Sequence, residues 1–98
     1  MKLDGALCYE KSVYVSAQDL QLDYRMLSLQ QDGREIYCLS IELIEGEERE
    51  SCLLWDVATC HSMAKRIWQL FTEGLVTPVT AQDIMEQLLS DRDFLYAD

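Results

Sequence analysis

The spacing of apolar residues changes near residue 58, and this change limits what the 98-residue chain can fold into. Before it, apolar residues recur at every second position, as in a half-buried strand. After it, they recur at every third or fourth position, as along one face of a helix. Strands and helices in separate blocks are typical of an α+β domain, in which helices cover an antiparallel sheet. We expect one domain over residues 1–98.

Strand-like segments fill the first half of the chain, over residues 6–16, 22–31, 35–45 and 49–57. The third is the clearest, because one face is apolar throughout: Tyr37, Leu39, Ile41 and Leu43. Asp32-Gly33 separates two alternating segments, and Gly accepts the positive φ of a tight hairpin turn. Parallel neighbours would need crossovers of a dozen or more residues. We expect a three- or four-stranded antiparallel meander over about residues 6–57.

Two helices are expected next, at about residues 59–73 and 81–90, packed on one face of the sheet. The first carries an apolar stripe of helical spacing: Cys60, Met63, Ala64, Ile67, Trp68, Phe71 and Leu75. Asp56 or Thr59 is expected to cap its start, and Gly74 to take the positive-φ position just past its end. The second is expected to begin with Thr80 as its cap, after a loop over residues 76–79.

The cysteines and tryptophans are interpreted as packing residues. No C-x-x-C pair occurs, so the sequence indicates neither a zinc ribbon nor a redox motif. Three of the four cysteines lie in apolar strand-like runs, where a free thiol behaves as a small buried hydrophobe: Cys8, Cys38 and Cys52. Trp55, at a strand end, and Trp68, in the first helix, are both expected in the core, because an indole supplies large buried area.

Cys60 and His61 are the one adjacent cysteine–histidine pair. A nucleophile and its base must lie within hydrogen-bond reach, and on a helix these two side chains point about 100° apart. One histidine with scattered cysteines has no metal-ligand spacing. The chain also lacks a Gly-rich nucleotide loop and a G-x-S-x-G elbow. The sequence therefore predicts no enzyme, no metal and no cofactor.

The charge balance argues against two classes of partner. Eighteen acids against eight bases give a net charge of −10. Nucleic acids and anionic membrane surfaces both recruit basic side chains, so neither is expected to bind. No apolar run approaches the roughly 20 residues of a membrane-spanning helix, and the N-terminus lacks the apolar stretch of a secretion signal. We expect a cytoplasmic protein, whose thiols stay reduced.

An acidic cluster and an apolar tail form the candidate interaction surface: Glu45, Glu47, Glu48, Glu50, Phe94 and Tyr96. The glutamates would suit a basic partner or a divalent cation, although no D-x-D-x-D-G calcium loop is present. They also suit a solvated turn that keeps the sheet edge from pairing with other molecules. We favour the solvated turn, because surface charge commonly serves solubility alone.

The region from Ala64 to Leu89 contains three short motifs: Ile67-Trp68-x-x-Phe71, Val76-Thr77-Pro78-Val79-Thr80 and Asp83-Ile84-x-x-x-Leu88. They resemble the ending of an uncharacterised family of short proteins of unknown function from clostridia-like anaerobic bacteria. The similarity covers about a quarter of the chain, and its markers are a helix stripe, a Thr-Pro turn and a capped second helix. It implies a cytoplasmic bacterial origin and no particular activity.

The sequence favours a small non-catalytic module that binds another protein. One alternative is an inhibitor or immunity-type protein that blocks a basic enzyme, such as a nuclease, by electrostatic complementarity. Another is a small-ligand-binding domain or an enzyme with a pocket between sheet and helices. A homodimer, formed through a sheet edge or the helical face, is compatible with each.

Overall fold

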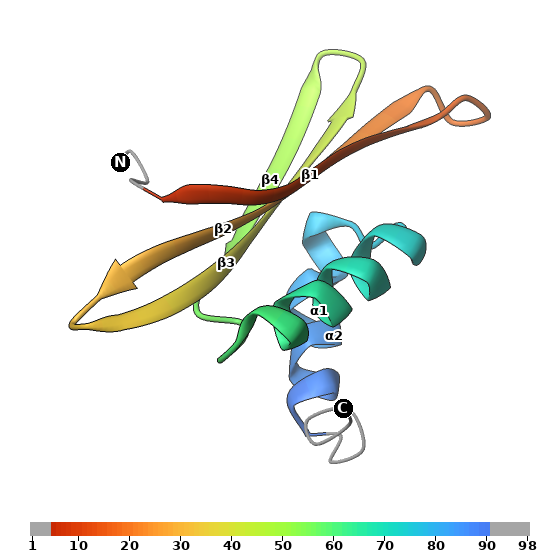
Figure 1. Ribbon diagram of the computed structural model, residues 1–98. Coiled ribbons are helices and arrows are strands. Elements are labelled where there is room, and N and C mark those ends of the chain that lie inside the picture. Colours follow the sequence, from red (N-terminus) through yellow and green to blue (C-terminus); the bar gives the residue numbers. More distant parts are fainter. Residues whose placement is uncertain (1–4, 91–98) are drawn as a thin grey trace.

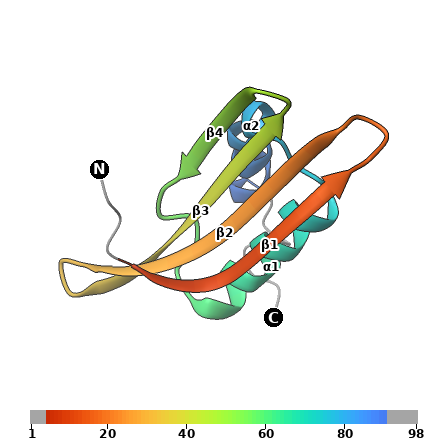
Figure 2. The same cartoon turned by 90° about the horizontal axis from the view of Figure 1, so that it is seen from above.

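The computed structural model describes residues 5–90, which form two layers (Figure 1). The elements are β1 (Ala6–Val15), β2 (Leu20–Gln31), β3 (Arg34–Glu45), β4 (Glu48–Leu54), α1 (His61–Glu73) and α2 (Pro78–Leu89). The strands form one antiparallel sheet in the order β1-β2-β3-β4. Both helices lie on the same side of it, α1 along β1 and β2, and α2 beneath β3 and β4 (Figure 2). The predicted α+β meander with two helices on one face is confirmed.

The hairpin turns form where the sequence places them. Asp32 and Gly33 have φ values of 54° and 75°, which is the two-residue pattern with positive φ at both positions. This turn pairs Gln31 with Arg34 and fixes the register of β2 against β3. Gly46, with φ 61°, closes the next hairpin. Because side chains alternate along each strand, these two registers decide which residues share a face.

The main core lies between the helices and one face of the sheet. It consists of large side chains that are fully or almost fully buried: Leu22, Tyr24, Met26, Tyr37, Leu39, Ile41, Ile67, Trp68, Phe71 and Met85. Tyr24 is a polar member, and its hydroxyl donates a 2.9 Å hydrogen bond to the carbonyl oxygen of Val76. Burial raises the pKa of Tyr24 to about 12. The bond ties the middle of the sheet to the link between the helices.

Helix α1 begins without the predicted side-chain cap. Its N-cap residue is Cys60, and neither Asp56 nor Thr59 caps it. The Asp56 carboxylate accepts from Arg34 instead, and the Thr59 hydroxyl donates to the sulfur of Met63. The prediction that Asp56 or Thr59 caps this helix was therefore wrong, because both oxygen groups are directed at other partners.

The end of α1 also differs from the prediction. Gly74 has an ordinary helical φ of −82°, whereas Leu75 takes the left-handed position with φ 51°. The amide of Val76 bonds the carbonyl of Phe71 across this turn, as in a Schellman motif. Val76 is buried and belongs to the same core as Phe71. Burial of Val76 thus sets where the helix stops, and a leucine accepts the strained φ.

Helix α2 begins at Pro78, two positions before the predicted cap Thr80. Proline suits the first helical position, because its fixed φ is already helical and its missing N–H has no intrahelical partner there. The Thr80 hydroxyl bonds the carbonyl oxygen of Thr77 rather than a free amide. The predicted loop over residues 76–79 is thus shortened by two residues.

Candidate interaction surface

The predicted acidic cluster lies at the hairpin between β3 and β4. Glu45 pairs with Glu48 beside the turn, and all four predicted glutamates, Glu45, Glu47, Glu48 and Glu50, are exposed. Like charges on paired strand residues repel each other strongly when they are buried, but water and salt screen this repulsion when they are exposed. Within residues 5–90, no group of three or more acidic, cysteine or histidine side chains converges enough to hold a metal ion. The predicted tail residues Phe94 and Tyr96 lie outside the described residues.

Cys60 is the most reactive thiol by its surroundings. It is exposed at the start of α1, where its sulfur lies 3.3 Å from the Ser62 hydroxyl. The hydrogen bond with Ser62, backbone amides of Met63 and Ser62, and the positive charge of Arg66 hold the pKa of Cys60 below its ordinary value. The free amides at a helix N-terminus also carry partial positive charge, which favours the thiolate form of a cysteine. A lone thiol of this kind reacts with electrophiles but has no built substrate site.

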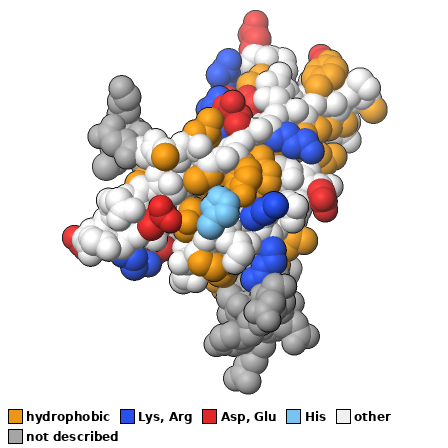
Figure 3. All heavy atoms as spheres, in the orientation of Figure 1, with side chains coloured by type: hydrophobic (Ala, Val, Ile, Leu, Met, Phe, Trp, Pro, Cys, Tyr) orange, Lys and Arg blue, Asp and Glu red, His pale blue; other side chains and the backbone are white. Residues whose placement is uncertain are grey.

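His61 is committed to a different partner. Its Nε2 lies 2.9 Å from the hydroxyl of Tyr9 on β1, and its ring lies edge-on to Tyr37. Tyr9 also stacks on Trp68 at a ring-centroid distance of 5.6 Å. In Figure 3 the histidine, pale blue, lies among hydrophobic side chains and beside basic ones. These contacts fasten α1 to the edge strand, and they do not join His61 to Cys60 as a nucleophile and base.

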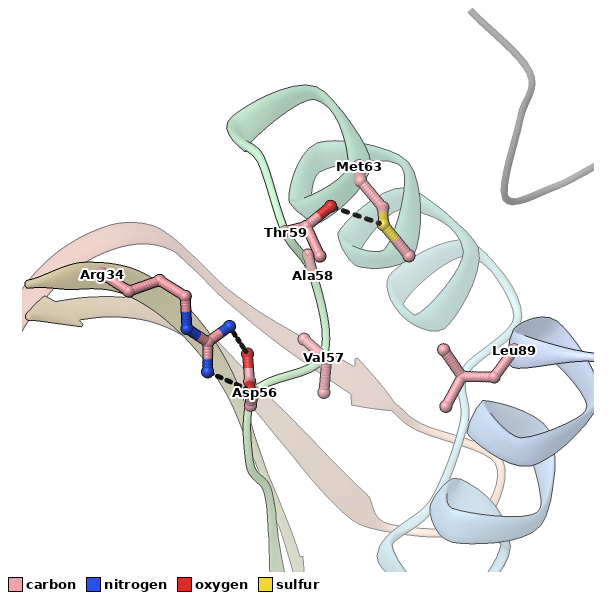
Figure 4. Close-up of a pocket in the computed structure, with 7 residues that line it drawn as sticks. All are labelled: Arg34, Asp56, Val57, Ala58, Thr59, Met63 and Leu89. Atoms are coloured by element: carbon pink, nitrogen blue, oxygen red, sulfur yellow. Dashed lines mark hydrogen bonds and ion pairs between the residues drawn. The ribbon is translucent and has the colours of Figure 1, made fainter. Parts of the chain in front are cut away.

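A hollow of about 300 Å³ opens between the sheet and the helices (Figure 4). Its lining is apolar apart from one ion pair and one hydroxyl: Arg34, Asp56, Val57, Ala58, Thr59, Met63 and Leu89. Arg34 donates two hydrogen bonds to Asp56, at 2.9 and 3.4 Å. The volume is at the small end for ligand pockets. The two charged groups of the rim bond each other.

The sheet face turned away from the helices has an apolar half. Ile36 and Cys38 of β3 are fully buried there, yet neither belongs to the core beneath the helices. We call the surface formed by them and their neighbours the apolar half-face: Leu7, Leu27, Leu29, Ile36, Cys38, Leu53 and Trp55. Three of these side chains stay about half exposed, Leu7 at 52%, Leu53 at 45% and Trp55 at 48%. The prediction that Trp55 is a core residue was wrong.

The strand registers bring these residues together. Leu7 pairs with Leu27, which pairs with Cys38, and Leu29 pairs with Ile36. On the side of Cys38 away from β2, the segment that follows β4 runs beside β3. There the backbone amide of Val57 donates a hydrogen bond to the carbonyl oxygen of Tyr37. Two residues, Trp55 and Asp56, therefore lie opposite Cys38, as in a bulge.

The other half of the open face is polar, and it contains two ion pairs and an acid, Asp23, that neutral side chains bond. Arg25 bonds Glu10 at 2.7 Å, and Arg49 lies 3.8 Å from Glu42. Asp23 accepts hydrogen bonds from Ser12 and Gln21. Burial acts to raise the pKa of Asp23, but these hydrogen bonds and the nearby arginines hold it below its ordinary value. This polar half-face lies towards the acidic β3–β4 turn, and the apolar half-face lies at the opposite end of the sheet.

Sequence reasoning missed the apolar half-face although the signal is present. Alternation in β3 assigns Ile36 and Cys38 to the face opposite Tyr37, and the Asp32-Gly33 turn sets them beside Leu27 and Leu29. No strand contributes more than two of the seven residues of this half-face. The patch becomes visible only when the four strands are aligned by their turns.

Comparison with protein-family models, curated proteins and solved structures finds no match for the chain. Among the described residues, 5–90, no helix is long and apolar enough to cross a membrane. The resemblance to short clostridia-like proteins stays a prediction.

Proposed function

We propose that this chain is a non-catalytic protein-interaction module and that the apolar half-face is its contact surface. One observation carries the proposal: Leu7, Leu53 and Trp55 are about half exposed on a face they share with fully buried Ile36 and Cys38. Contiguous exposed apolar patches on small proteins commonly mark binding sites. Tryptophan is also among the residues that most often anchor protein interfaces.

The chemistry of the patch indicates the chemistry of its partner. None of its seven residues is charged, and within residues 5–90 two ion pairs flank it, Arg25 with Glu10 and Arg34 with Asp56. A complementary surface would be apolar and weakly charged, and its binding would depend little on salt, because few charges approach one another. An inhibitor of a basic enzyme would instead use the exposed glutamates of the β3–β4 turn, and its binding would weaken steeply with salt.

The proposal places the chain in the cytoplasm of a bacterium. All four cysteines are free thiols, one of them exposed, and this suits a reducing compartment. The bacterial origin rests on the resemblance of residues 64–89 to short proteins from clostridia-like anaerobes.

Affinity capture from the source cells tests the proposal with a matched pair of variants. Leu53 on the open face and Leu70 on α1 are 45% and 44% exposed, so Leu53→Gln and Leu70→Gln remove equally accessible side chains from opposite layers. We expect wild type and Leu70→Gln to retain the same protein, at low and at high salt, and Leu53→Gln to lose it. Equal retention by both variants would show that this face is not the contact surface.

A further inference from the structure

We infer that the occupant of the apolar half-face is the same half-face of a second copy of this chain, so that two sheets stack into a four-layer dimer. This inference rests on the proposed function, and it names the partner. Two sheets that pack face to face keep their strands within about 30° of each other and interdigitate their side chains at a spacing of about 10 Å. Three features favour a second copy: the distribution of charge over the surface, the direction of the strands and the structure of the sheet edges.

Charge leaves few surfaces through which two copies can meet. The chain carries a net charge of −10, so most of its surface repels a second copy. The apolar half-face contains no ionisable group other than the buried thiol of Cys38, whose pKa burial raises. In the polar half-face, the acids Glu10 and Glu42 are offset by Arg25 and Arg49, and a third acid, Asp23, is bonded by the neutral side chains of Ser12 and Gln21. The open face is therefore the large surface on which self-contact meets little repulsion.

The direction of the strands reduces the repulsion further. An isologous contact between two copies has a two-fold axis. If this axis lies between the two sheets and perpendicular to their strands, the strands of one copy run opposite to those of the other. The apolar half-faces then overlap at the centre. The acidic turns, which include Glu47 and Glu48, extend to opposite ends of the dimer.

The sheet edges are poor alternatives for self-association. The free edge strand β1 is interrupted by a register shift between Leu7 and Tyr9 and carries Lys11. The other edge strand, β4, is seven residues long and exposes Glu48 and Glu50. Bulges, short length and charged residues are the features that keep edges from pairing with other chains. The open sheet face is therefore favoured over both edges for self-association.

The size of the patch predicts a weak, reversible dimer. Four strands spaced about 4.8 Å apart, over about six residues of about 3.3 Å each, give a flat area of roughly 400 Å² per copy. This is about half of the roughly 800 Å² that each partner contributes to a standard stable interface. We therefore expect a dissociation constant in the micromolar range or above.

Sedimentation velocity of the purified chain tests the inference, from low micromolar to several hundred micromolar protein. We expect the wild type to shift from monomer to dimer over this range, at low and at high salt alike. Leu70→Gln should behave as wild type, whereas Leu53→Gln should weaken association at least about tenfold, as expected for losing a half-exposed apolar contact of the interface. A wild type that stays monomeric throughout, or equal association of the two variants, would overturn the inference.

The two failures can be told apart. If the purified chain is monomeric but Leu53→Gln still abolishes capture of a different protein, the proposed function stands and the second copy is the wrong occupant. Tryptophan emission locates the contact independently, because Trp55 is half exposed and Trp68 is only 8% exposed. We expect the emission to shift to shorter wavelength as the dimer forms. Doubling of the mass with unchanged emission would place the contact elsewhere and contradict the inference.

Discussion

The two faces of this sheet differ in what covers their apolar side chains. On one face, Tyr24, Leu39 and Ile41 are fully buried beneath two helices. On the other, Ile36 and Cys38 are equally buried, but Leu53 and Trp55 beside them stay about half exposed. The comparison teaches that apolar content alone does not identify the core. The covered face stabilises the fold, and we propose that the open face serves association.

The largest effect should come from truncating the covered face. Phe71→Ala empties a fully buried site between α1 and the sheet, and we expect it to lower the free energy of unfolding by about 3–5 kcal/mol. Leu53→Gln, on the open face, should cost the monomer less than about 1 kcal/mol. Urea unfolding at low protein concentration measures both. A cost for Leu53→Gln as large as that for Phe71→Ala would contradict the distinction between the faces.

The next effect tests a polar member of the covered core. Tyr24→Phe leaves the Val76 carbonyl without its partner, and we expect a loss of about 1–2 kcal/mol. Tyr14→Phe is the control, because Tyr14 is exposed and bonds only the neighbouring turn residue Asp19. Urea unfolding at neutral pH should show little change in this control.

Alkaline pH sharpens the same comparison. The pKa of Tyr24 is about 12 in the folded chain, above its ordinary value of 10.0. The folded state therefore holds this proton more tightly, and its stabilising contribution is complete below pH 10 and is lost as pH rises towards 12. We expect the urea midpoint of the wild type to fall more steeply over this window than that of Tyr24→Phe. Parallel curves would show that Tyr24 is not the group responsible.

A smaller effect concerns the link between the helices. Leu75 has φ 51° and is 40% exposed, so Leu75→Gly removes strain while giving up little burial. We expect a gain of about 0.5–1 kcal/mol. Gly46→Ala is the converse control: at φ 61° it should lose a similar amount. Destabilisation by Leu75→Gly would show that the leucine side chain contributes more than its backbone costs.

The smallest effect distinguishes two thiols. Cys60 is exposed and its pKa is lowered, first by its hydrogen bond with Ser62, whereas Cys38 is buried and desolvation raises its pKa. Because the thiolate is the reactive form, we expect iodoacetamide at neutral pH to modify Cys60 first and Cys38 last. Ser62→Ala should slow the reaction of Cys60 a few-fold. Mass spectrometry of a time course measures the rates, and equal rates at both sites would contradict the assignment.

Much of the fold could be predicted from the sequence, because alternation and turn chemistry are local signals. The segment at residues 35–45 and the Asp32-Gly33 turn were enough to define the central hairpin, and the stripe through Ile67 and Phe71 defined the first helix. The helix ends were predicted less well. Burial of Val76 and the fixed φ of Pro78 decided them, and these effects outweighed the capping preferences of Thr59 and Thr80.

The candidate surface was harder to predict than the fold. Trp55 was assigned to the core because large aromatic residues are usually buried, but its face depends on a bulge opposite Cys38 and on the register of four strands together. Its exposure is a property of the assembled sheet. The charged turn at Glu45–Glu48 was visible in the sequence, and its role as a partner site stays a prediction.

Side-chain footprinting with hydroxyl radicals tests most directly whether the open face is a contact surface. Labelling is compared between the dilute purified chain and the chain in concentrated extract of its source cells, with Leu53 and Trp55 as probes of the open face and Leu70 and Val79 as probes of the helices. We predict that the extract protects Leu53 and Trp55 and leaves Leu70 and Val79 as reactive as before. Equal labelling of Leu53 and Trp55 in both samples would contradict the account.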